Sequence, residues 1–193
     1  MDRQPTLTPA VPLTDGTVLL RLPDGRDSAA VYTYGQDPDL EETAWLPIPF
    51  PCPLDVAGRT VREFQKGWQG SHGLTLVIAM PPDDELRGVL HLSAHTAGVG
   101  EIGYGIAPRF RRRGLTTRAV RLVAAWAFAH LGFTRLEIVV TAPGIHGLAS
   151  RRVAEKAGFV YEGFGAPISR RPVATTRTRS TSCRRLPHPS LQL

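Results

Sequence analysis

The chain has 193 residues, 42% of them hydrophobic, which is enough for one domain with a sizeable buried core. It contains no apolar run long enough to span a membrane, and its first residues lack the apolar stretch of a signal peptide. The only cysteines, Cys52 and Cys183, predict neither a disulfide framework nor a zinc site, and the histidines are scattered. These features favour a cytoplasmic protein with no metal and no membrane anchor.

The net charge of +6 comes from one end of the chain. Residues 165–193 hold six of the 23 basic residues and no acid, which leaves 17 basic residues against 17 acidic ones. This segment also lacks apolar alternation, so we expect no strand in it. We interpret residues 1–164 as one domain and 165–193 as a basic tail, either disordered or produced by a shift of reading frame in the gene. An arm that contacts RNA or the ribosome is the alternative.

After a proline-rich start, the sequence predicts a short strand at Thr17–Leu22 and a first helix at Asp24–Gln36, capped by Asp24. A segment with four prolines, Trp45–Pro53, then excludes a helix. Trp45 and Phe50 on this segment are candidates for the wall of a substrate groove, and a small satellite core is an equally good interpretation.

Apolar spacing predicts a second helix at Leu54–Trp68. Gly73–Met80 and Leu86–His95 then predict an antiparallel hairpin. His91 and His95 have the spacing of metal ligands on a helix, but they lie in a predicted strand. We therefore expect solvated histidines there.

A strand is predicted at Glu101–Ala107, with Gly103 and Gly105 leaving one face bare for the approach of another group. Apolar residues at three- and four-residue spacing then predict a helix at Gly114–Leu131, with Gly132 as its left-handed cap. A buried strand at Arg135–Thr141 follows.

The start of the Gly114–Leu131 helix predicts a phosphate site, because a first helical turn has unpaired N–H groups and a partial positive charge. Gly114 allows a ligand to approach the backbone, and Thr116 and Thr117 offer hydroxyl groups. The P-loop and Rossmann glycine patterns are absent. Basic side chains precede the helix at four positions: Arg109, Arg111, Arg112 and Arg113.

Four motifs in order resemble the GNAT superfamily of N-acetyltransferases, and most of all its ribosomal-protein (RimJ/RimL-like) branch. The superfamily carries Arg/Gln-x-x-Gly-x-Gly/Ala between its fourth strand and third helix, matched here by Arg111–Thr116. Ile102–Tyr104, Ala127–Phe128 and the run from Ser150 to Gly163 also match the branch. Thr116 replaces the usual small residue, and Gly147 stands where the branch usually has an Asn.

This resemblance implies an α/β fold with a central mixed, mostly antiparallel sheet flanked by helices. It also implies transfer of an acetyl group from acetyl-CoA to an amine, without a metal. The phosphates of coenzyme A would bind N–H groups from Arg112 to Thr116. A backbone N–H of Ile106 or Ala107 would polarise the thioester. The implied cofactor residues are therefore Ile106, Ala107, Arg111, Arg112, Arg113, Gly114, Leu115, Thr116 and Thr117.

Glu101 is the best-placed candidate for the base. The alternative interpretation of Glu101 is a solvent-facing residue at the edge of a strand. Glu162 is the second candidate for the base. Ser150 matches a residue that protonates the thiolate or binds the cofactor in some members. The N-cap of a helix predicted at Leu148–Ala157 and closed by Gly158 is the other interpretation of Ser150. Tyr104 and Tyr161 are less specific candidates for the acid. Neither cysteine lies in a matched motif, which disfavours covalent catalysis.

The acceptor amine stays open between a protein N-terminus, a ribosomal protein, an amino sugar and a small polyamine. A homodimer and a ribosome or RNA contact through the tail are further open partners. The alternative function is a non-catalytic acetyl-CoA-binding module, motivated by Thr116, Gly147 and the expected lack of a last strand.

Overall fold

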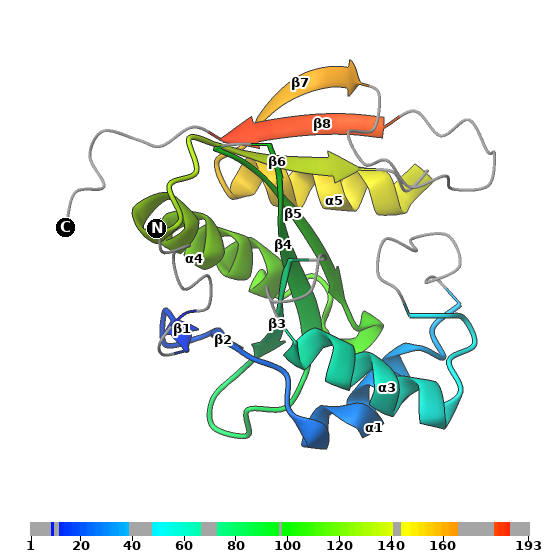
Figure 1. Ribbon diagram of the computed structural model, residues 1–193. Helices are drawn as coiled ribbons and strands as arrows, with labels where there is room; N and C mark the ends of the chain where they lie inside the picture. Colours follow the sequence, from blue (N-terminus) through cyan, green and yellow to red (C-terminus); the bar gives the residue numbers. More distant parts are fainter. Residues whose placement is uncertain are drawn as a thin grey trace.

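The computed structural model describes residues 9, 12–38, 48–66, 73–96, 98–140, 144–165 and 180–185. Eight strands within these ranges form one sheet (Figure 1). They are β1 (Leu13–Thr14), β2 (Leu19–Arg21), β3 (Leu74–Ala79), β4 (Gly88–Thr96), β5 (Val99–Ile106), β6 (Arg135–Val140), β7 (Val160–Gly165) and β8 (Ser180–Arg185).

The strand order is β1-β2-β3-β4-β5-β6-β8-β7. Only β5 and β6 pair in parallel, and each of the other neighbouring pairs is antiparallel. The long connection between β5 and β6 is required by this parallel pair, because a hairpin cannot join parallel strands. The predicted mixed, mostly antiparallel sheet is confirmed.

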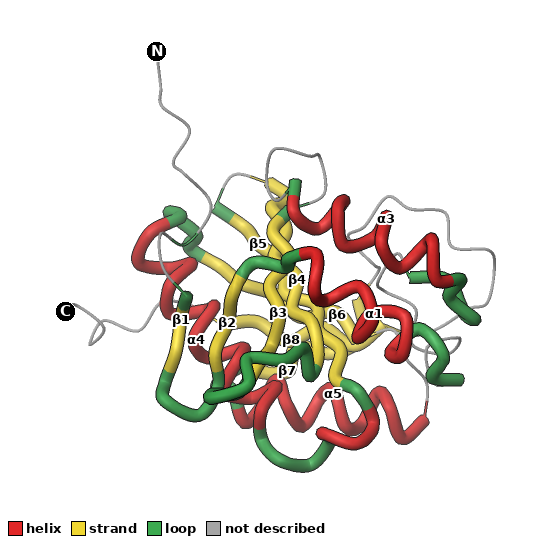
Figure 2. The backbone as a smooth tube through the Cα atoms, turned by 90° about the horizontal axis from the view of Figure 1, so that it is seen from below, coloured by secondary structure: helices red, strands yellow, loops and turns green. Residues whose placement is uncertain are grey.

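Helices cover both faces of the sheet, as Figure 2 shows. On one face lie α1 (Ser28–Tyr34) and α3 (Leu54–Gln65), and on the other lie α4 (Leu115–His130) and α5 (Gly144–Lys156). Short 3-10 turns at Gly25–Asp27 (η1) and Pro108–Phe110 (η3) precede α1 and α4. The side chain of Asp24 accepts a hydrogen bond from the N–H of Arg26 and caps η1. It was predicted to cap the first helix itself, but α1 begins only at Ser28.

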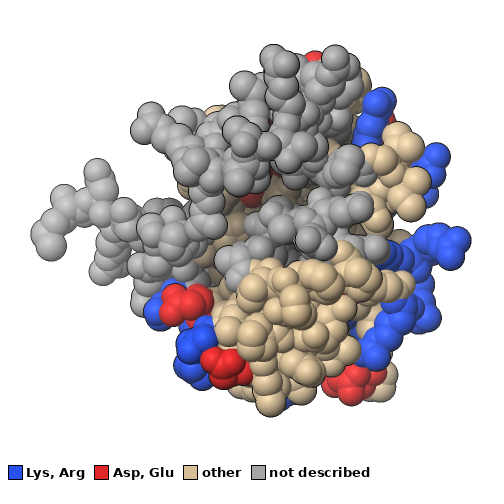
Figure 3. Space-filling view, turned by 90° about the vertical axis from the view of Figure 1, so that its right-hand side faces the viewer, with Lys and Arg blue, Asp and Glu red and all other residues tan. Residues whose placement is uncertain are grey.

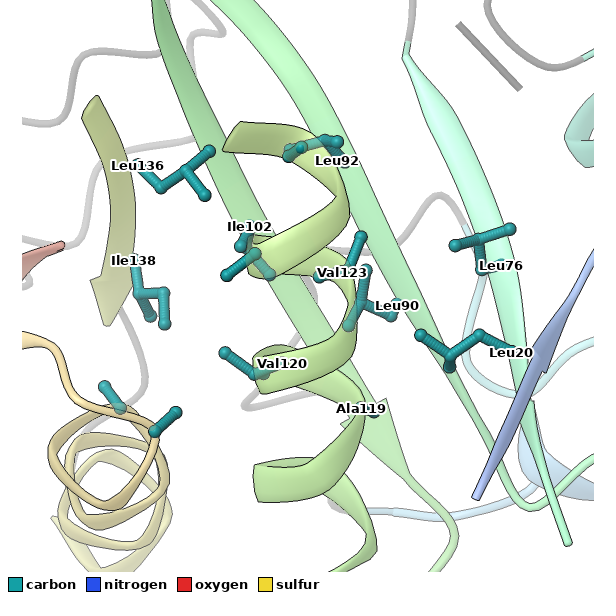
Figure 4. Packing of buried hydrophobic residues seen from close by; sticks show 14 of the residues in the cluster. Leu20, Leu76, Leu90, Leu92, Ile102, Ala119, Val120, Val123, Leu136 and Ile138 are labelled. Carbon is teal, nitrogen blue, oxygen red and sulfur yellow. The ribbon is translucent and has the colours of Figure 1, made fainter. Parts of the chain in front are cut away.

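The larger core lies between the sheet and α4 and α5. Alternate residues of the strands point to this face, in accordance with the two-residue period of a strand. Figure 4 shows Ala119, Val120 and Val123 of α4 facing Leu90 and Ile102 of the sheet. All five side chains are almost completely buried.

A second core lies on the opposite face, under α1 and α3. Val61 and Phe64 of α3 pack there with Val77 and Val89 of the sheet, so the apolar spacing that predicted this helix is confirmed at these two positions. α3 ends at Gln65, and residues 67–72 of the predicted helix and its loop lie outside the described residues. In β3 and β4, this face therefore takes the alternate residues that do not lie under α4.

The segment 165–193, which was expected to contain no strand, contains one. Ser180–Arg185 form β8, which lies inside the sheet between β6 and β7 and pairs with both. The expectation that residues 165–193 supply no strand is therefore wrong for these six residues. β1, at the end of the proline-rich start, is a second strand that the sequence analysis missed. The frame-shift hypothesis stays a hypothesis.

Charged side chains are unevenly spread over the surface. In the space-filling view, Lys and Arg gather mainly along the right-hand edge of the face that is drawn (Figure 3). Among the helices that the structure describes, none is both long and apolar enough to cross a bilayer.

Candidate active site

The strands β5 and β6 meet at one end and diverge at the other (Figure 1). Among the described residues, their pairing covers Val99 with Arg135, Gly100 with Leu136 and Glu101 with Glu137. Beyond Glu101, no described strand pairs with β5 on this side. The result is a gap between two strands in the middle of a sheet, at the level of residues 102–106.

Backbone alternation decides which groups of β5 point into this gap. The N–H of Ala107 donates to the carbonyl of Arg87, at 2.9 Å, and therefore points toward β4. Successive backbone N–H groups of a strand point to opposite sides. The N–H groups of Ile106 and Tyr104 consequently point away from β4, into the gap. Of the two residues expected to polarise a thioester, Ile106 has the suitable direction and Ala107 is already bonded.

The loop after β5 ends in an uncapped helix start. Gly114 is the N-cap of α4, with φ 74°, and no side chain caps the helix. The first backbone hydrogen bond of this helix runs from Arg118 N–H to Gly114 O, at 3.1 Å. The N–H groups of Leu115, Thr116 and Thr117 thus lack partners within the helix, as expected for a first turn. A ligand anion is suited to them.

The basic side chains of this loop divide into two kinds. Arg111 is tied back into the fold, since its Nη2 atom bonds the buried carboxylate of Asp37 at 3.1 Å. Arg112 and Arg113 are exposed and have no carboxylate partner in the part of the chain that the structure describes. Around Gly114 there is open space, because an added Cβ would meet no atom within 4 Å. The loop can therefore admit an anion close to its backbone.

Tyr104 and Ser150 join β5 to α5 beside the gap. The Tyr104 hydroxyl donates to the backbone carbonyl of Ser150 at 2.8 Å, and Ser150 Oγ donates to Tyr104 Oη at 3.1 Å. α5 begins at Gly144, so Ser150 lies inside the helix. The N-cap interpretation of Ser150 is wrong, because the helix starts one turn earlier than the sequence predicted.

Glu101 lies on the opposite face of the sheet. Ile102 is buried in the α4 and α5 core, so Glu101 and the bare Gly103 and Gly105 point to the face of α1 and α3. Glu137 is the register neighbour of Glu101 on β6 and is only 3% exposed. A salt bridge from Arg135 engages one oxygen of Glu137, and the other has no hydrogen-bond partner among the described residues. Two carboxylates therefore stand side by side where the strands part.

His91 was expected to be solvated, and the structure corrects this. Its side chain is half-buried, and Nδ1 lies 2.9 Å from the hydroxyl of Thr75 on β3. His91 is the register partner of Gly103, so it lies on the same face as Glu101. The side chain of His95 lies outside the described residues. No sequence pattern had separated His91 from a surface histidine.

The other candidates lie elsewhere. Glu162 of β7 is paired with Arg135 at 2.7 Å, and β6 and β8 separate its strand from β5. The Tyr161 ring is covered by the guanidinium of Arg151, at 3.9 Å. Phe50 is 37% exposed, and Trp45 lies outside the described residues. Within the described ranges, no three His, Cys, Asp or Glu side chains are grouped so that they could hold a metal ion.

Solved structures of other proteins share this fold. A putative ribosomal-protein-serine acetyltransferase from Vibrio cholerae superposes with a TM-score of 0.75, at 20% identity, over 93% of this chain and 99% of that one. RimJ of Mycobacterium smegmatis, in complex with a CoA disulfide, gives 0.71 at 22% identity, over 91% and 85%. At these identities the likeness establishes the fold.

Sequence comparisons add the family. The probable N-acetyltransferase YjcK of Bacillus subtilis is 33% identical over 109 residues, which span 55% of this chain and 59% of YjcK. The match thus extends over little more than half of that relative's length. The family model described as "Acetyltransferase (GNAT) domain" matches residues 17–160, which is most of the chain. The chain therefore belongs to the GNAT family, whose members are acetyl-CoA-dependent acetyltransferases.

Proposed function

We propose that this chain transfers the acetyl group of acetyl-CoA to an amine, by direct attack of the amine in a ternary complex. One observation carries the proposal. The gap between β5 and β6 lies at the end of β5 that leads, through a short loop, to the uncapped start of α4, and this arrangement suits an extended ligand with a phosphate end.

The donor would be held by backbone groups. Its pyrophosphate would accept hydrogen bonds from N–H groups between Arg112 and Thr116, with Thr117 at the same turn. The N–H of Ile106 would donate to the thioester carbonyl, stabilising the negative charge that grows on this oxygen during attack. Bound acetyl-CoA supplies an activated acyl carbon with a thiolate leaving group.

The two proton transfers would occur on opposite faces of the sheet. Glu101, on the face of α1 and α3, would take a proton from the acceptor ammonium, directly or through water. Ser150, bonded to Tyr104 on the face of α5, would give a proton to the departing thiolate. A base and an acid separated in this way suit an amine that enters from one face while the thiolate leaves on the other.

The acceptor would be a protein N-terminus or a small-molecule amine, with Trp45 and Phe50 as candidates for its binding wall. Membership of the ribosomal-protein branch is part of the proposal, supported by the motifs from Ser150 to Gly163 and by the names of two structural neighbours. A homodimer and a contact of the tail with RNA or the ribosome belong to the same set of proposals.

The test is calorimetric titration of acetyl-CoA into the purified chain and into Gly114→Glu. Gly132→Glu is the matched control, because Gly132 also has a positive φ and open space but lies at the other end of α4. We expect one-to-one binding by the unaltered chain and by the control, and its loss in Gly114→Glu. Equal binding by all three proteins would show that the donor does not lie on this loop.

A non-catalytic acetyl-CoA-binding module is the alternative that the sequence raised. One of its motives was the expected lack of a last strand, and β8 removes that motive. Acetyl-CoA binding without transfer to any of a panel of amines and peptide N-termini would favour this alternative.

A further inference from the structure

Three guanidinium groups surround one aromatic ring on the loop between β5 and α4. The ring belongs to Phe110, in η3. The carbon atoms at the centres of the Arg87, Arg109 and Arg113 guanidinium groups lie 4.5, 4.8 and 5.5 Å from its centroid. Two of these arginines flank the ring in the sequence, whereas Arg87 reaches it from the turn before β4.

Among the described residues, carboxylates neutralise one of the three positive charges, that of Arg87. Arg87 is nearly buried and forms salt bridges with Asp83 and with Glu85, the latter at 2.9 Å. Arg109 and Arg113 are exposed, and the described residues offer them no carboxylate partner. Two uncompensated cations held around one ring repel each other, and a bound anion would relieve this repulsion.

Stacking on Phe110 leaves these cations able to bind. A guanidinium contacts an aromatic ring through its face, and its N–H donors lie in its plane and stay available at the edge. Planar donors of this kind match the oxygens of a phosphate. The Phe110 ring therefore holds Arg109 and Arg113 in place without consuming their hydrogen-bonding capacity, as an ion pair within the protein would.

The position of this cluster indicates which anion it binds. Arg113 immediately precedes Gly114, the N-cap of α4, where the proposed function places a pyrophosphate. Besides the pyrophosphate on the 5′ carbon of its ribose, coenzyme A carries a third phosphate on the 3′ hydroxyl of the same ribose. We propose that Arg109 and Arg113, supported by Phe110, form a subsite for the 3′-phosphate of coenzyme A. This inference rests on the proposed function.

The experiment compares coenzyme A with dephospho-coenzyme A, which lacks only the 3′-phosphate. Calorimetric dissociation constants for both ligands are measured with the full chain, Arg109→Ala, Arg113→Ala and Phe110→Leu. Arg62→Ala is the charge-matched control, because Arg62 is an exposed arginine of α3. Circular dichroism melting shows that each variant is folded.

We expect the unaltered chain and Arg62→Ala to bind coenzyme A roughly tenfold to hundredfold more tightly than the dephospho form, as charge-assisted hydrogen bonds would give. Each arginine variant should lose most of that preference while keeping its affinity for dephospho-coenzyme A. Phe110→Leu should lose part of it, because the guanidinium groups are no longer stacked.

Two results would overturn the proposal and leave the proposed function intact. One is an unaltered chain that binds both ligands equally. The other is an equal loss of both affinities in the arginine variants, which would assign these side chains to the pyrophosphate or to general electrostatic attraction. An unaltered chain that binds neither ligand would instead refute the proposed function, and this subsite with it.

Discussion

The hydroxyl groups of Tyr104 and Ser150 are hydrogen-bonded to each other, at 3.1 Å, beside the gap between β5 and β6. Tyr104 also donates to the backbone carbonyl of Ser150, so the strand and α5 are held together by two bonds. Two roles fit a pair of hydroxyl groups at this position. One is to pass a proton to a leaving thiolate, and the other is only to hold β5 and α5 together.

Ser150→Ala separates these two roles. If the hydroxyl gives the proton, we expect kcat to fall by roughly 10²-fold or more, with little change in the affinity for acetyl-CoA. The bond from Tyr104 to the Ser150 carbonyl remains in this variant, so the melting temperature should change little. Steady-state kinetics and thermal unfolding of the same preparation provide both measurements.

Tyr104→Phe and Ser150→Thr are the matched variants. Tyr104→Phe removes both bonds and should lower stability by roughly 1 kcal/mol per bond as well as activity. Ser150→Thr keeps a hydroxyl and should keep most of the activity. Full activity in Ser150→Ala would show that the two hydroxyl groups have a structural role and no role in proton transfer.

Glu101→Gln should slow transfer by roughly 10²-fold to 10⁴-fold near neutral pH, because the amide cannot accept the proton of the acceptor ammonium. The defect should shrink as pH rises, since more of the acceptor is then already unprotonated. The pH profile of kcat/KM measures this.

Glu162→Gln tests the competing base. Glu162 lies on β7 and is paired with Arg135, so we expect its loss to cost little activity. A larger defect in Glu162→Gln than in Glu101→Gln would reverse the assignment.

The sequence predicted those elements whose residue spacing alone determines their structure. The strand before Arg111, the glycine at the helix start and the apolar stripe of α4 all follow from spacing, and each lies where it was predicted. The directions of the side chains were not predictable. Arg111 was predicted to bind a phosphate, and in the structure its guanidinium bonds Asp37. Asp37 is distant from Arg111 in the sequence, so only the fold shows that the two residues are neighbours.

The strand β8 could not be predicted for a different reason. Its residues, Ser180–Arg185, include no aliphatic side chain, and strand prediction depends on apolar alternation. These residues become a strand because β6 and β7 leave backbone groups to be paired on both sides. Tertiary pairing overrides intrinsic preference here.

Truncation after Gly165 tests the importance of β8. We expect the shortened chain to melt at a clearly lower temperature and to aggregate, because two strand edges would lose their partner. Thermal unfolding and size-exclusion chromatography of the two chains give the comparison. A truncated chain that is as stable and monodisperse as the full chain would show that β8 is dispensable.

The carboxylate of Asp15 should make stability depend on pH. Burial raises its pKa, but hydrogen bonds from Val18, Arg118 and Thr17 lower it by more, so the net pKa is below its ordinary value. A lowered pKa stabilises the fold above the ordinary value and loses this contribution as pH falls through the folded-state value. Stability from Asp15 should therefore be present at pH 7 and disappear below about pH 4.

Asp15→Asn is the variant for this test. It removes the ion pair with Arg118, which at 2.7 Å joins the turn before β2 to α4. We expect a loss of about 1 kcal/mol at pH 7 and a smaller difference from the unaltered chain at pH 3, measured by urea unfolding. An equal difference at both pH values would contradict the assignment.

Gly88→Ala should damage the candidate site from a distance. An added Cβ at Gly88 would lie 2.3 Å from the Gly105 carbonyl oxygen and 3.0 Å from the Ile106 Cα, so β4 and β5 must move apart. We expect a loss of roughly 1–3 kcal/mol in stability. Acetyl-CoA should also bind more weakly, because the displaced strand carries the Ile106 N–H.

Gly25→Ala is the control for that substitution, since an added Cβ there meets no atom within 4 Å. Urea unfolding and acetyl-CoA titration of both variants separate a general effect of adding a methyl group from an effect on the β4–β5 pair. If Gly88→Ala lost stability but bound acetyl-CoA normally, the position of the Ile106 N–H would not control donor binding. The thioester would then need another hydrogen-bond donor at the gap, and the N–H of Tyr104, which points the same way, would be the next to consider.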